Sequence, residues 1–355
     1  MKKLKSLFGN YYFNFALIVI FTGVVMYVSL YKNLEAVMAV VANASIFWMV
    51  IVVLLAYFLQ VIDGLVLKTL ANISHPNYSL ANGFVNTMVA ALFNGVTPSS
   101  TTGQVAQIYV FDKQGVKASS SVSILLMDFI LYQVVLVGIS LLFLTFKFSY
   151  FLSLYNSSLW LVIMGFLVDS FFVVMLFLLS SSPKVYSWVS HKGLNLLDKL
   201  HLIKNKEATL QRLDDELTQF HYAWNNLKSH RQAMIKVIIF NVFRLLLYYS
   251  VPVLVMIALK VPLTLDKAFN LMVLTTFVGM MNHLVPSPGG AGTVEASFIL
   301  LVSPLCGYIN TVSCSLLWRF ATYHLKIVTG AILFAILGKI YKKKPDEIQN
   351  PENPK

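Results

Sequence analysis

The sequence has few charged residues, few cysteines and no nucleotide-binding loop. Only 12% of its 355 residues are Asp, Glu, Lys or Arg, whereas about 25% is usual in soluble domains. Cys306 and Cys314 are the two cysteines of the chain. They form no Cys-x-x-Cys pair, so we interpret them as small apolar residues. No Gly-x-x-x-x-Gly-Lys-Ser/Thr motif occurs, which argues against direct coupling to ATP.

Long hydrophobic runs dominate the chain, and 57% of its residues are hydrophobic. A helix needs about 20 apolar residues to cross the roughly 30 Å hydrocarbon core of a bilayer. Six runs meet this length, at residues 11–30, 46–66, 119–146, 158–179, 234–259 and 311–338. The sequence therefore predicts an all-α polytopic membrane protein. The first run is longer than the apolar core of a signal peptide and has no small-x-small cleavage site after it, so we expect it to be retained.

Two weaker apolar segments are interrupted by helix-breaking residues. The first apolar segment, 79–96, is followed by stretch 97–104, and the second, 268–285, is followed by stretch 286–293. Both stretches are rich in Pro, Gly, Ser and Thr. A second short apolar piece follows each stretch. Because proline and glycine interrupt helices, each region is expected to form a broken hairpin.

The positive charges predict how the chain is threaded. Lys and Arg are concentrated at Lys2, Lys3 and Lys5, in segment 184–231 with eight of them, and at Lys342, Lys343 and Lys344. All three places face the cytoplasm under the positive-inside rule if each broken hairpin returns to its own side. We therefore predict six full spans, two re-entrant hairpins and cytoplasmic N- and C-termini. Hairpins of two complete helices would satisfy the same charges.

Two segments are expected outside the membrane-embedded part, which we place within residues 1–344. Segment 184–231 has periodic leucines with charges between them, which predicts a cytoplasmic amphipathic insert. We favour a structural role for it over a catalytic cluster of its histidines. Segment 345–355, rich in Pro, Asn, Lys and Glu, is expected to be a disordered tail. The formal net charge of +12 thus has a topological explanation, and no nucleic-acid partner is expected.

The chain contains an internal repeat. A shift of 191 residues superposes the two broken regions, and seven of the nineteen positions from 125 to 143 are identical to those from 316 to 334. The halves, about 45–146 and 236–337, run in opposite directions in the predicted topology. Inverted repeats with paired broken helices are typical of transporters whose site lies between the halves. Both hairpin tips are therefore expected to meet a polar cavity.

Charged residues inside apolar spans are candidates for function, because burying them in a membrane is costly. They are Asp128, Asp169, Arg244, Glu295, Arg319 and Lys326, with Asp63 and Lys236 near span ends. One hypothesis places a lipid phosphate against Arg319 and the glycine-rich start of the helix after residue 292. Glu295 and Asp128 would then contact a cationic headgroup or take part in proton coupling. An equally weighted alternative is that Arg319 forms a structural ion pair with Glu295 or Asp128.

The candidate substrate-binding set joins these charges to the two broken regions. Prolines in the set are favoured as hairpin formers, and its two tyrosines either line the cavity or pack. No catalytic residue, metal site or cofactor is expected. The set comprises Thr97, Pro98, Gly103, Gln104, Asp128, Tyr132, Pro286, Pro288, Gly289, Gly290, Gly292, Glu295, Arg319 and Tyr323.

These motifs carry a resemblance to a known family. The chain reads Phe93-Asn94-Gly95-Val96-Thr97-Pro98, Gly103-Gln104-Val105-Ala106-Gln107, Pro286-Ser287-Pro288-Gly289-Gly290-Ala291-Gly292-Thr293-Val294-Glu295 and Trp318-Arg319-Phe320-x-x-Tyr323. Over nearly its whole length it resembles the lysylphosphatidylglycerol synthase transmembrane family. That family includes the N-terminal flippase domain of the bacterial multiple peptide resistance factor.

The resemblance implies a flippase of the bacterial cell membrane. Its substrate would be lysyl-phosphatidylglycerol or a related phospholipid, and its activity would contribute to resistance to cationic antimicrobial peptides. Two departures bear on this. The family's usual Gly-Gly-Gln-Pro is Thr102-Gly103-Gln104-Val105 here, which leaves the substrate open. The chain also ends about fifteen residues after its last predicted span without the soluble aminoacyl-transferase domain of the resistance factor, so we do not expect it to transfer lysine alone.

Two other functions stay open at this point. The chain is alternatively a phosphatidylglycerol lysyltransferase, or its membrane subunit working with a separate aminoacyl-lipid synthase. It is alternatively an accessory protein for polyprenyl-phosphate glycolipids that works with a glycosyltransferase, because related membrane domains occur attached to such enzymes.

Overall fold

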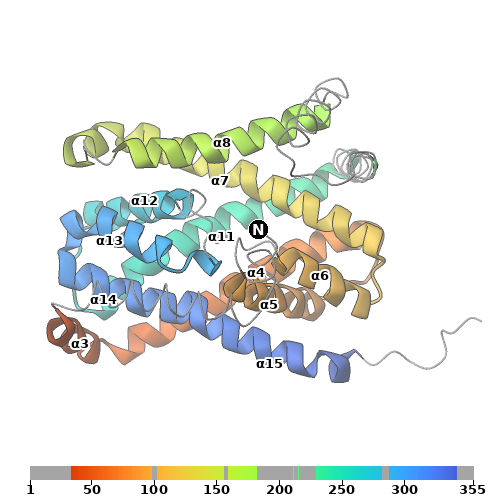
Figure 1. Ribbon diagram of the computed structural model, residues 1–355, viewed down its shortest axis with the longest axis horizontal. Helices are drawn as coiled ribbons and strands as arrows, with labels where there is room; N and C mark the ends of the chain where they lie inside the picture. The colour runs from red at the N-terminus through yellow and green to blue at the C-terminus, as the bar shows by residue number, and fades with distance from the viewer. Residues whose placement is uncertain are drawn as a thin grey trace, which may run out of the picture.

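The computed structural model describes residues 33–97, 102–155, 159–181, 211, 215, 229–281 and 288–341. Every regular element in these residues is helical, in agreement with the predicted all-α class (Figure 1). The predicted run 11–30, the tail 345–355 and nearly all of the insert 184–231 lie outside the described residues. The helices are α3 (Leu34–Ala42), α4 (Ile46–Ser74), α5 (Leu80–Val96), α6 (Thr102–Lys113), α7 (Ala118–Tyr155), α8 (Leu159–Ser181), α11 (Arg231–Ala258), α12 (Leu265–Met281), α13 (Thr293–Cys306), α14 (Tyr308–Arg319) and α15 (Leu325–Ile340).

Four of the described helical stretches are long and apolar enough to cross a membrane. They are Ile46–Ser74, Ala118–Lys147, Arg231–Ala258 and Tyr308–Ile340, and each coincides with one of the predicted spans to within one residue or extends beyond it. Helix α8 covers the predicted run 158–179 from residue 159 onward. The short helix α3, which precedes α4, was not predicted from the sequence.

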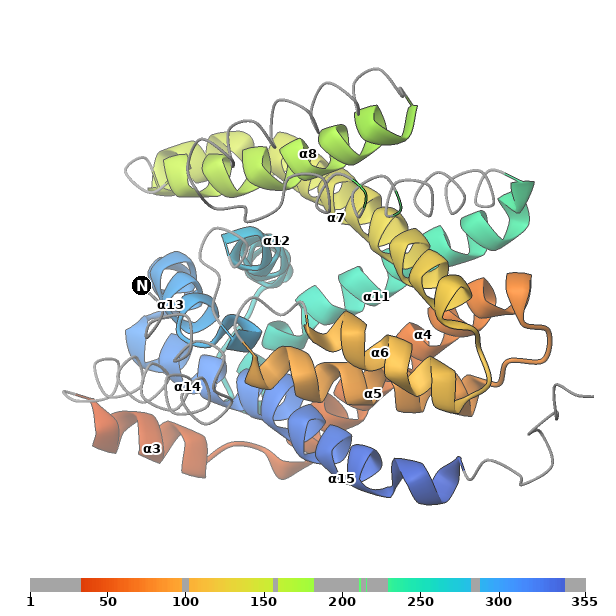
Figure 2. The ribbon, with the colours of Figure 1, turned by 45° about the vertical axis from the view of Figure 1, so that its right-hand side comes forward.

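Both broken regions form pairs of packed helices. Helix α5 packs against α6, and α12 packs against α13 (Figure 2). The first pair is interrupted after Val96 and resumes at Thr102. The second is interrupted after Met281, passes through a short 3-10 turn at Pro288–Gly290 and resumes at Thr293.

The two halves present the same order of elements. Helices α4, α5, α6 and α7 are matched by α11, α12, α13 and the continuous α14–α15 helix. The first helices of the halves, α4 and α11, pack along one another. The backbone N–H of Ser45, just before α4, donates to the carbonyl oxygen of Ala258 at the end of α11, at 2.7 Å. The two helices are therefore antiparallel.

Glycines allow close helix contacts on both sides of α5. A Cβ atom on Gly83 of α5 would lie 2.3 Å from the carbonyl oxygen of Gly64 on α4, and one on Gly330 of α15 would lie 2.3 Å from that of Met88 on α5. No real side chain fits at such distances, so the backbones touch, as small residues permit in membrane bundles. Helix α5 is thereby held between α4 of its own half and α15 of the other.

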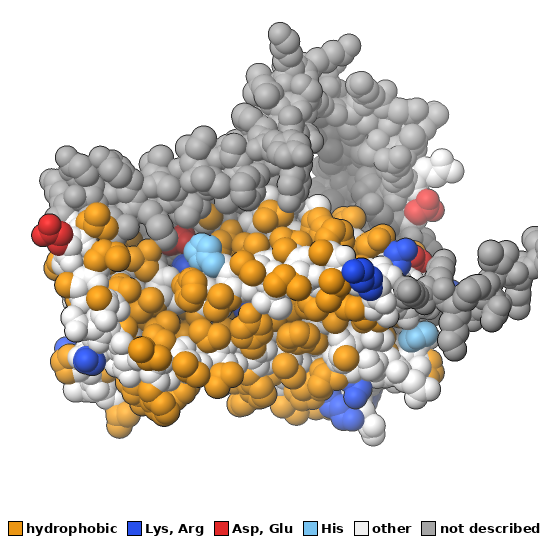
Figure 3. Space-filling view, turned by 90° about the horizontal axis from the view of Figure 1, so that it is seen from below, with side chains coloured by type: hydrophobic (Ala, Val, Ile, Leu, Met, Phe, Trp, Pro, Cys, Tyr) orange, Lys and Arg blue, Asp and Glu red, His pale blue; other side chains and the backbone are white. Residues whose placement is uncertain are grey.

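The outer surface of the bundle is strongly apolar. Ile46, Phe47 and Leu54 are 81%, 69% and 64% exposed, and Ile332 on α15 is 57% exposed. Figure 3 shows a face covered largely by hydrophobic side chains, with few charged ones. Soluble monomers rarely expose contiguous apolar patches above a few hundred Å². This surface therefore fits contact with lipid chains.

A polar network closes the base of the first hairpin. The hydroxyl of Tyr78 donates to Oε1 of Gln114 at 2.6 Å, and Nε2 of Gln114 donates to the carbonyl oxygen of Asn82 at 2.9 Å. Tyr341 after α15 joins it by donating to Oδ1 of Asn82, also at 2.9 Å. Burial raises the pKa of Tyr78, so this hydroxyl remains a donor at neutral pH.

Candidate functional site

The tip of the second hairpin is built by glycines in left-handed conformations. Gly289, Gly290 and Gly292 have φ values of 55°, 70° and 83°, which glycine adopts without the steric cost that other residues meet. The turn ends where α13 begins, and the N–H of Gly292 donates to Oε2 of Glu295 at 2.6 Å. This is the carboxylate half of a capping box. It fixes the side chain of Glu295 at the hairpin tip.

Arg319 on α14 completes a buried ion pair with Glu295. Its Nε atom donates to Oε1 of Glu295 at 2.7 Å, and the two side chains are 6% and 7% exposed. Its Nη2 atom donates to the carbonyl oxygen of Gly289 at 3.0 Å. Of the two ion-pair partners considered from the sequence, the structure brings Glu295 to Arg319.

Tyr323 connects this pair to the first hairpin. The guanidinium carbon of Arg319 lies 3.9 Å from the centre of the Tyr323 ring. The Tyr323 hydroxyl donates to the carbonyl oxygen of Gly95, near the end of α5, at 2.9 Å. A Cβ on Gly289 would lie 2.3 Å from Cε2 of the same ring. The two hairpin tips therefore meet at Tyr323, one from each side.

The helix that carries Tyr323 is locally widened. Residues Phe320–His324 form a π-helical turn between α14 and α15. Such turns are rare in proteins, and many of those that occur lie at functional sites. The equivalent helix of the first half, α7, is assigned as one α-helix from Ala118 to Tyr155.

The first tip is closed by its own polar contacts. The hydroxyl of Thr102 donates to that of Thr97 at 2.6 Å, and the N–H of Gly103 donates to Oδ1 of Asn94 at 3.0 Å. Gln104, the repeat equivalent of Glu295, is exposed, so it does not make a buried pair like the one at the second tip. Pro98 and Pro286 lie outside the described residues, and Pro288 begins the 3-10 turn before Gly289.

A second charged cluster lies between α4, α7 and α11. Arg244 of α11 forms an ion pair with Asp63 of α4, and Gln60 donates to the other oxygen of Asp63 at 2.9 Å. The guanidinium carbon of Arg244 lies 4.7 Å from the centre of the Tyr132 ring. Tyr132 therefore belongs to this cluster and not to the contact between the hairpin tips.

Asp128 lies one helical turn before Tyr132 on α7. One of its carboxylate oxygens is buried and has no hydrogen-bond partner among the described residues. Lys326 on α15 is half-buried and makes no ion pair within the described part of the chain. Asp128 is thus a carboxylate without a described partner, whereas Glu295 is fully engaged.

The Asp63–Arg244 pair was missing from the candidate set, although both residues were noted as intramembrane charges. A signal was available in their positions. Asp63 lies 11 residues before the end of α4 at Ser74, and Arg244 lies 13 residues after the start of α11 at Arg231. In antiparallel helices of about 1.5 Å rise per residue, these positions have nearly the same depth. The sequence did not show that α4 packs against α11, and this contact was needed to predict the ion pair.

Comparison with known protein families gives a match over most of the chain. The family model described as the lysylphosphatidylglycerol synthase TM region matches residues 14–330. This range includes both hairpins, the Glu295–Arg319 pair and the Asp63–Arg244 pair. A search of curated proteins finds no match for the chain.

Proposed function

The chain belongs to the lysylphosphatidylglycerol synthase transmembrane family, and from this premise we propose that it moves a phospholipid between the leaflets of a bacterial cell membrane. The proposed substrate is lysyl-phosphatidylglycerol or a close relative. The proposed physiological result is resistance to cationic antimicrobial peptides, because a cationic lipid in the outer leaflet lowers the negative charge of the surface.

One observation carries this proposal: the tips of two broken helical hairpins meet at a buried ion pair. Glu295 and Gly289 come from the second hairpin, Gly95 comes from the first, and Arg319 and Tyr323 hold them together. Paired broken helices that face each other between two halves are the usual setting of a transporter site. We place the lipid headgroup there during its passage.

The antiparallel packing of α4 against α11 supports the inverted-repeat topology. In the proposed arrangement there are six full spans, and the pairs α5–α6 and α12–α13 are re-entrant hairpins. Both chain termini lie on the cytoplasmic side. The matching order of helices in the two halves is what an inverted duplication produces.

The ion pair also indicates the kind of headgroup that fits. Separating Arg319 from Glu295 would leave two buried charges without partners, and an uncompensated buried charge costs about 3–5 kcal/mol. A headgroup with both a phosphate and an ammonium group would offer a partner to each. Lysyl-phosphatidylglycerol has both groups, whereas phosphatidylglycerol has the phosphate alone. We therefore propose that the lipid replaces the internal ion pair: its phosphate would contact Arg319, and its ammonium group would contact Glu295.

The experiment compares headgroups in vesicles that contain the purified full chain. Transbilayer movement is measured for labelled lysyl-phosphatidylglycerol, phosphatidylethanolamine, phosphatidylglycerol and phosphatidic acid, of which the last two have a phosphate and no ammonium group. We expect movement of the lipids with both phosphate and ammonium groups, and slower movement of the others. Equal rates for all four, or no movement in folded protein, would refute the proposal.

The name of the family also refers to a synthase, which favours lipid aminoacylation as the second candidate. The same vesicles, supplied with phosphatidylglycerol and lysyl-tRNA, test it. Appearance of lysyl-phosphatidylglycerol without a second protein would favour the transferase over the translocase.

A further inference from the structure

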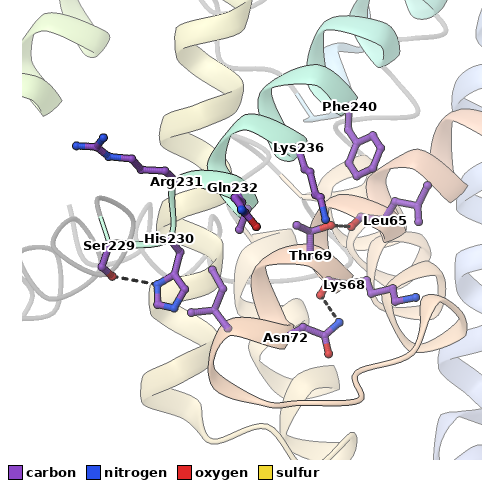
Figure 4. A pocket seen from close by; sticks show the side chains of 12 residues that line it. Leu65, Lys68, Thr69, Asn72, Ser229, His230, Arg231, Gln232, Lys236 and Phe240 are labelled. Carbon is purple, nitrogen blue, oxygen red and sulfur yellow. Dashed lines mark hydrogen bonds between the residues drawn. The ribbon is translucent and has the colours of Figure 1, made fainter.

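A basic groove lies between α4 and α11, away from the contact of the hairpin tips. It has a volume of about 920 Å³ and is formed by the last third of α4 and the first turns of α11 (Figure 4). We call it the basic groove and define it by Leu65, Lys68, Arg231, Lys236 and Phe240.

The groove has an excess of positive charge. Lys68, Arg231 and Lys236 line it, and its described lining includes no Asp or Glu. None of these three cations makes an ion pair with a residue in the described part of the chain. Figure 4 shows Lys236 extending from α11 toward Thr69 on α4. An anion in the groove would therefore meet lysines from both helices, with no competing carboxylate among the described lining residues.

The groove is also amphipathic along its length. Phe240 lies one turn deeper on α11 than Lys236, and Leu65 lies one turn deeper on α4 than Lys68, a step of about 5 Å in each helix. One further turn along α11 from Phe240 is Arg244, which pairs with Asp63. The groove therefore changes from basic at the helix ends to apolar toward the middle of the bundle. This order of groups matches a phospholipid, in which a charged phosphate precedes the acyl chains.

We propose that the basic groove binds the phosphodiester of an anionic glycerophospholipid, with Lys68 and Lys236 on the phosphate and Leu65 and Phe240 against the first part of an acyl chain. The groove discriminates against lysyl-phosphatidylglycerol, because Lys68 and Lys236 repel its lysyl group. The basic groove is thus separate from the hairpin contact. It prefers an anionic lipid, whereas the hairpin contact is proposed to take a lipid with an ammonium group. Its assignment to the cytoplasmic leaflet rests on the topology of the proposed function, but its lipid preference does not.

The test measures binding of fluorescent phosphatidylglycerol to the purified full chain in neutral detergent. Phosphatidylcholine, lysyl-phosphatidylglycerol and inorganic phosphate are the competitors. A basic residue near an anionic lipid contributes about 1 kcal/mol, which is roughly fivefold in affinity. We expect Lys68→Gln with Lys236→Gln to weaken phosphatidylglycerol binding about 25-fold, on the same arithmetic. Lys68→Arg with Lys236→Arg should retain it.

The matched control is Lys117→Gln. Lys117 is exposed in the connection between α6 and α7 and is no part of the groove lining, so its neutralisation should leave affinity unchanged. If the double glutamine variant does not fold, the salt dependence of lipid binding to the wild-type chain serves as the test instead. The attraction between the lysines and the phosphate should weaken as salt screens it. Salt-independent binding would then overturn the proposal.

Three other outcomes would also overturn it. One is equal affinity for phosphatidylcholine or for lysyl-phosphatidylglycerol. Another is an unchanged affinity in the folded glutamine variant. The third is displacement by inorganic phosphate as effective as displacement by the lipid, which would reassign the groove to a free anion. A variant at the ion pair, Glu295→Gln, should keep groove binding even if it abolishes lipid movement, so the two proposals fail separately.

Discussion

Substituting alanine for Gly289 tests whether the two hairpin tips meet as described. Gly289 has a φ of 55°, and a Cβ there would lie 2.3 Å from Cε2 and 2.9 Å from Cζ of Tyr323. A left-handed conformation costs a residue with a Cβ about 1–2 kcal/mol, and overpacking of a tight contact costs about 1–3 kcal/mol more. We therefore expect Gly289→Ala to lower the free energy of unfolding by about 2–5 kcal/mol.

Gly115 provides the matched control for this substitution. It has a φ of 85°, and nothing lies within 4 Å of a Cβ placed on it. Gly115→Ala should therefore incur only the conformational cost of about 1–2 kcal/mol. The stability of both variants is measured by denaturant unfolding in the same detergent. The difference between them isolates the overlap with Tyr323.

A second background makes the comparison sharper. In protein that carries Tyr323→Ala, the ring that a Cβ on Gly289 would strike is absent, so Gly289→Ala should cost no more than Gly115→Ala. An equal cost of Gly289→Ala in both backgrounds would refute the contact between Tyr323 and the second hairpin tip.

The remaining predictions concern charge and burial. Arg319→Ala should cost about 3–5 kcal/mol, because it leaves Glu295 as an uncompensated buried charge, and thermal unfolding should show this as a clear fall in the midpoint. Arg244→Ala should be destabilising but less so than Arg319→Ala, because Arg244 and Asp63 are 17% and 20% exposed. Lys147→Ala removes an ion pair whose aspartate is 71% exposed and should cost less than Arg244→Ala; equal losses for these two variants would contradict the assignment of the partly buried pair. Because burial raises the pKa of Tyr78, the hydroxyl contributes stability that is complete below its unfolded pKa of about 10 and is lost at higher pH. Tyr78→Phe should reduce this alkaline loss, as followed by unfolding between neutral and alkaline pH.

Much of the architecture could be predicted because membrane helices are specified by length and hydropathy. Helices α4, α7, α11 and the α14–α15 helix coincide with predicted apolar runs, since each must satisfy its backbone hydrogen bonds internally. Their ends were less predictable. Helix α4 continues to Ser74, beyond the predicted limit at 66, because a helix does not have to end where its apolar stretch ends.

The candidate site was predictable only in part. The glycine-rich stretch followed by Glu295 predicts the start of a helix, and in the structure Glu295 lies in the first turn of α13. The role of Tyr323 in joining the two hairpin tips could not be predicted, because it depends on which helices pack together and a single sequence does not show this. The shift of 191 residues aligns Gln104 of the first half with Glu295 of the second. Gln104 is exposed, whereas Glu295 is buried in an ion pair, so the alignment of the two positions did not predict their different surroundings.

The most direct test of the central claim is the rate of lipid movement in a variant whose buried ion pair has been neutralised. The double variant Glu295→Gln with Arg319→Gln removes both charges at the hairpin contact and leaves no unpaired one. The control, Lys147→Gln with Asp266→Asn, neutralises the exposed pair in the same way. Both are compared with wild type for movement of labelled lysyl-phosphatidylglycerol in vesicles at equal protein content. The account predicts at least about a tenfold fall for the first variant, since a buried charge pair contributes about 2–5 kcal/mol to recognition, and a wild-type rate for the control. A wild-type rate in both variants would contradict it.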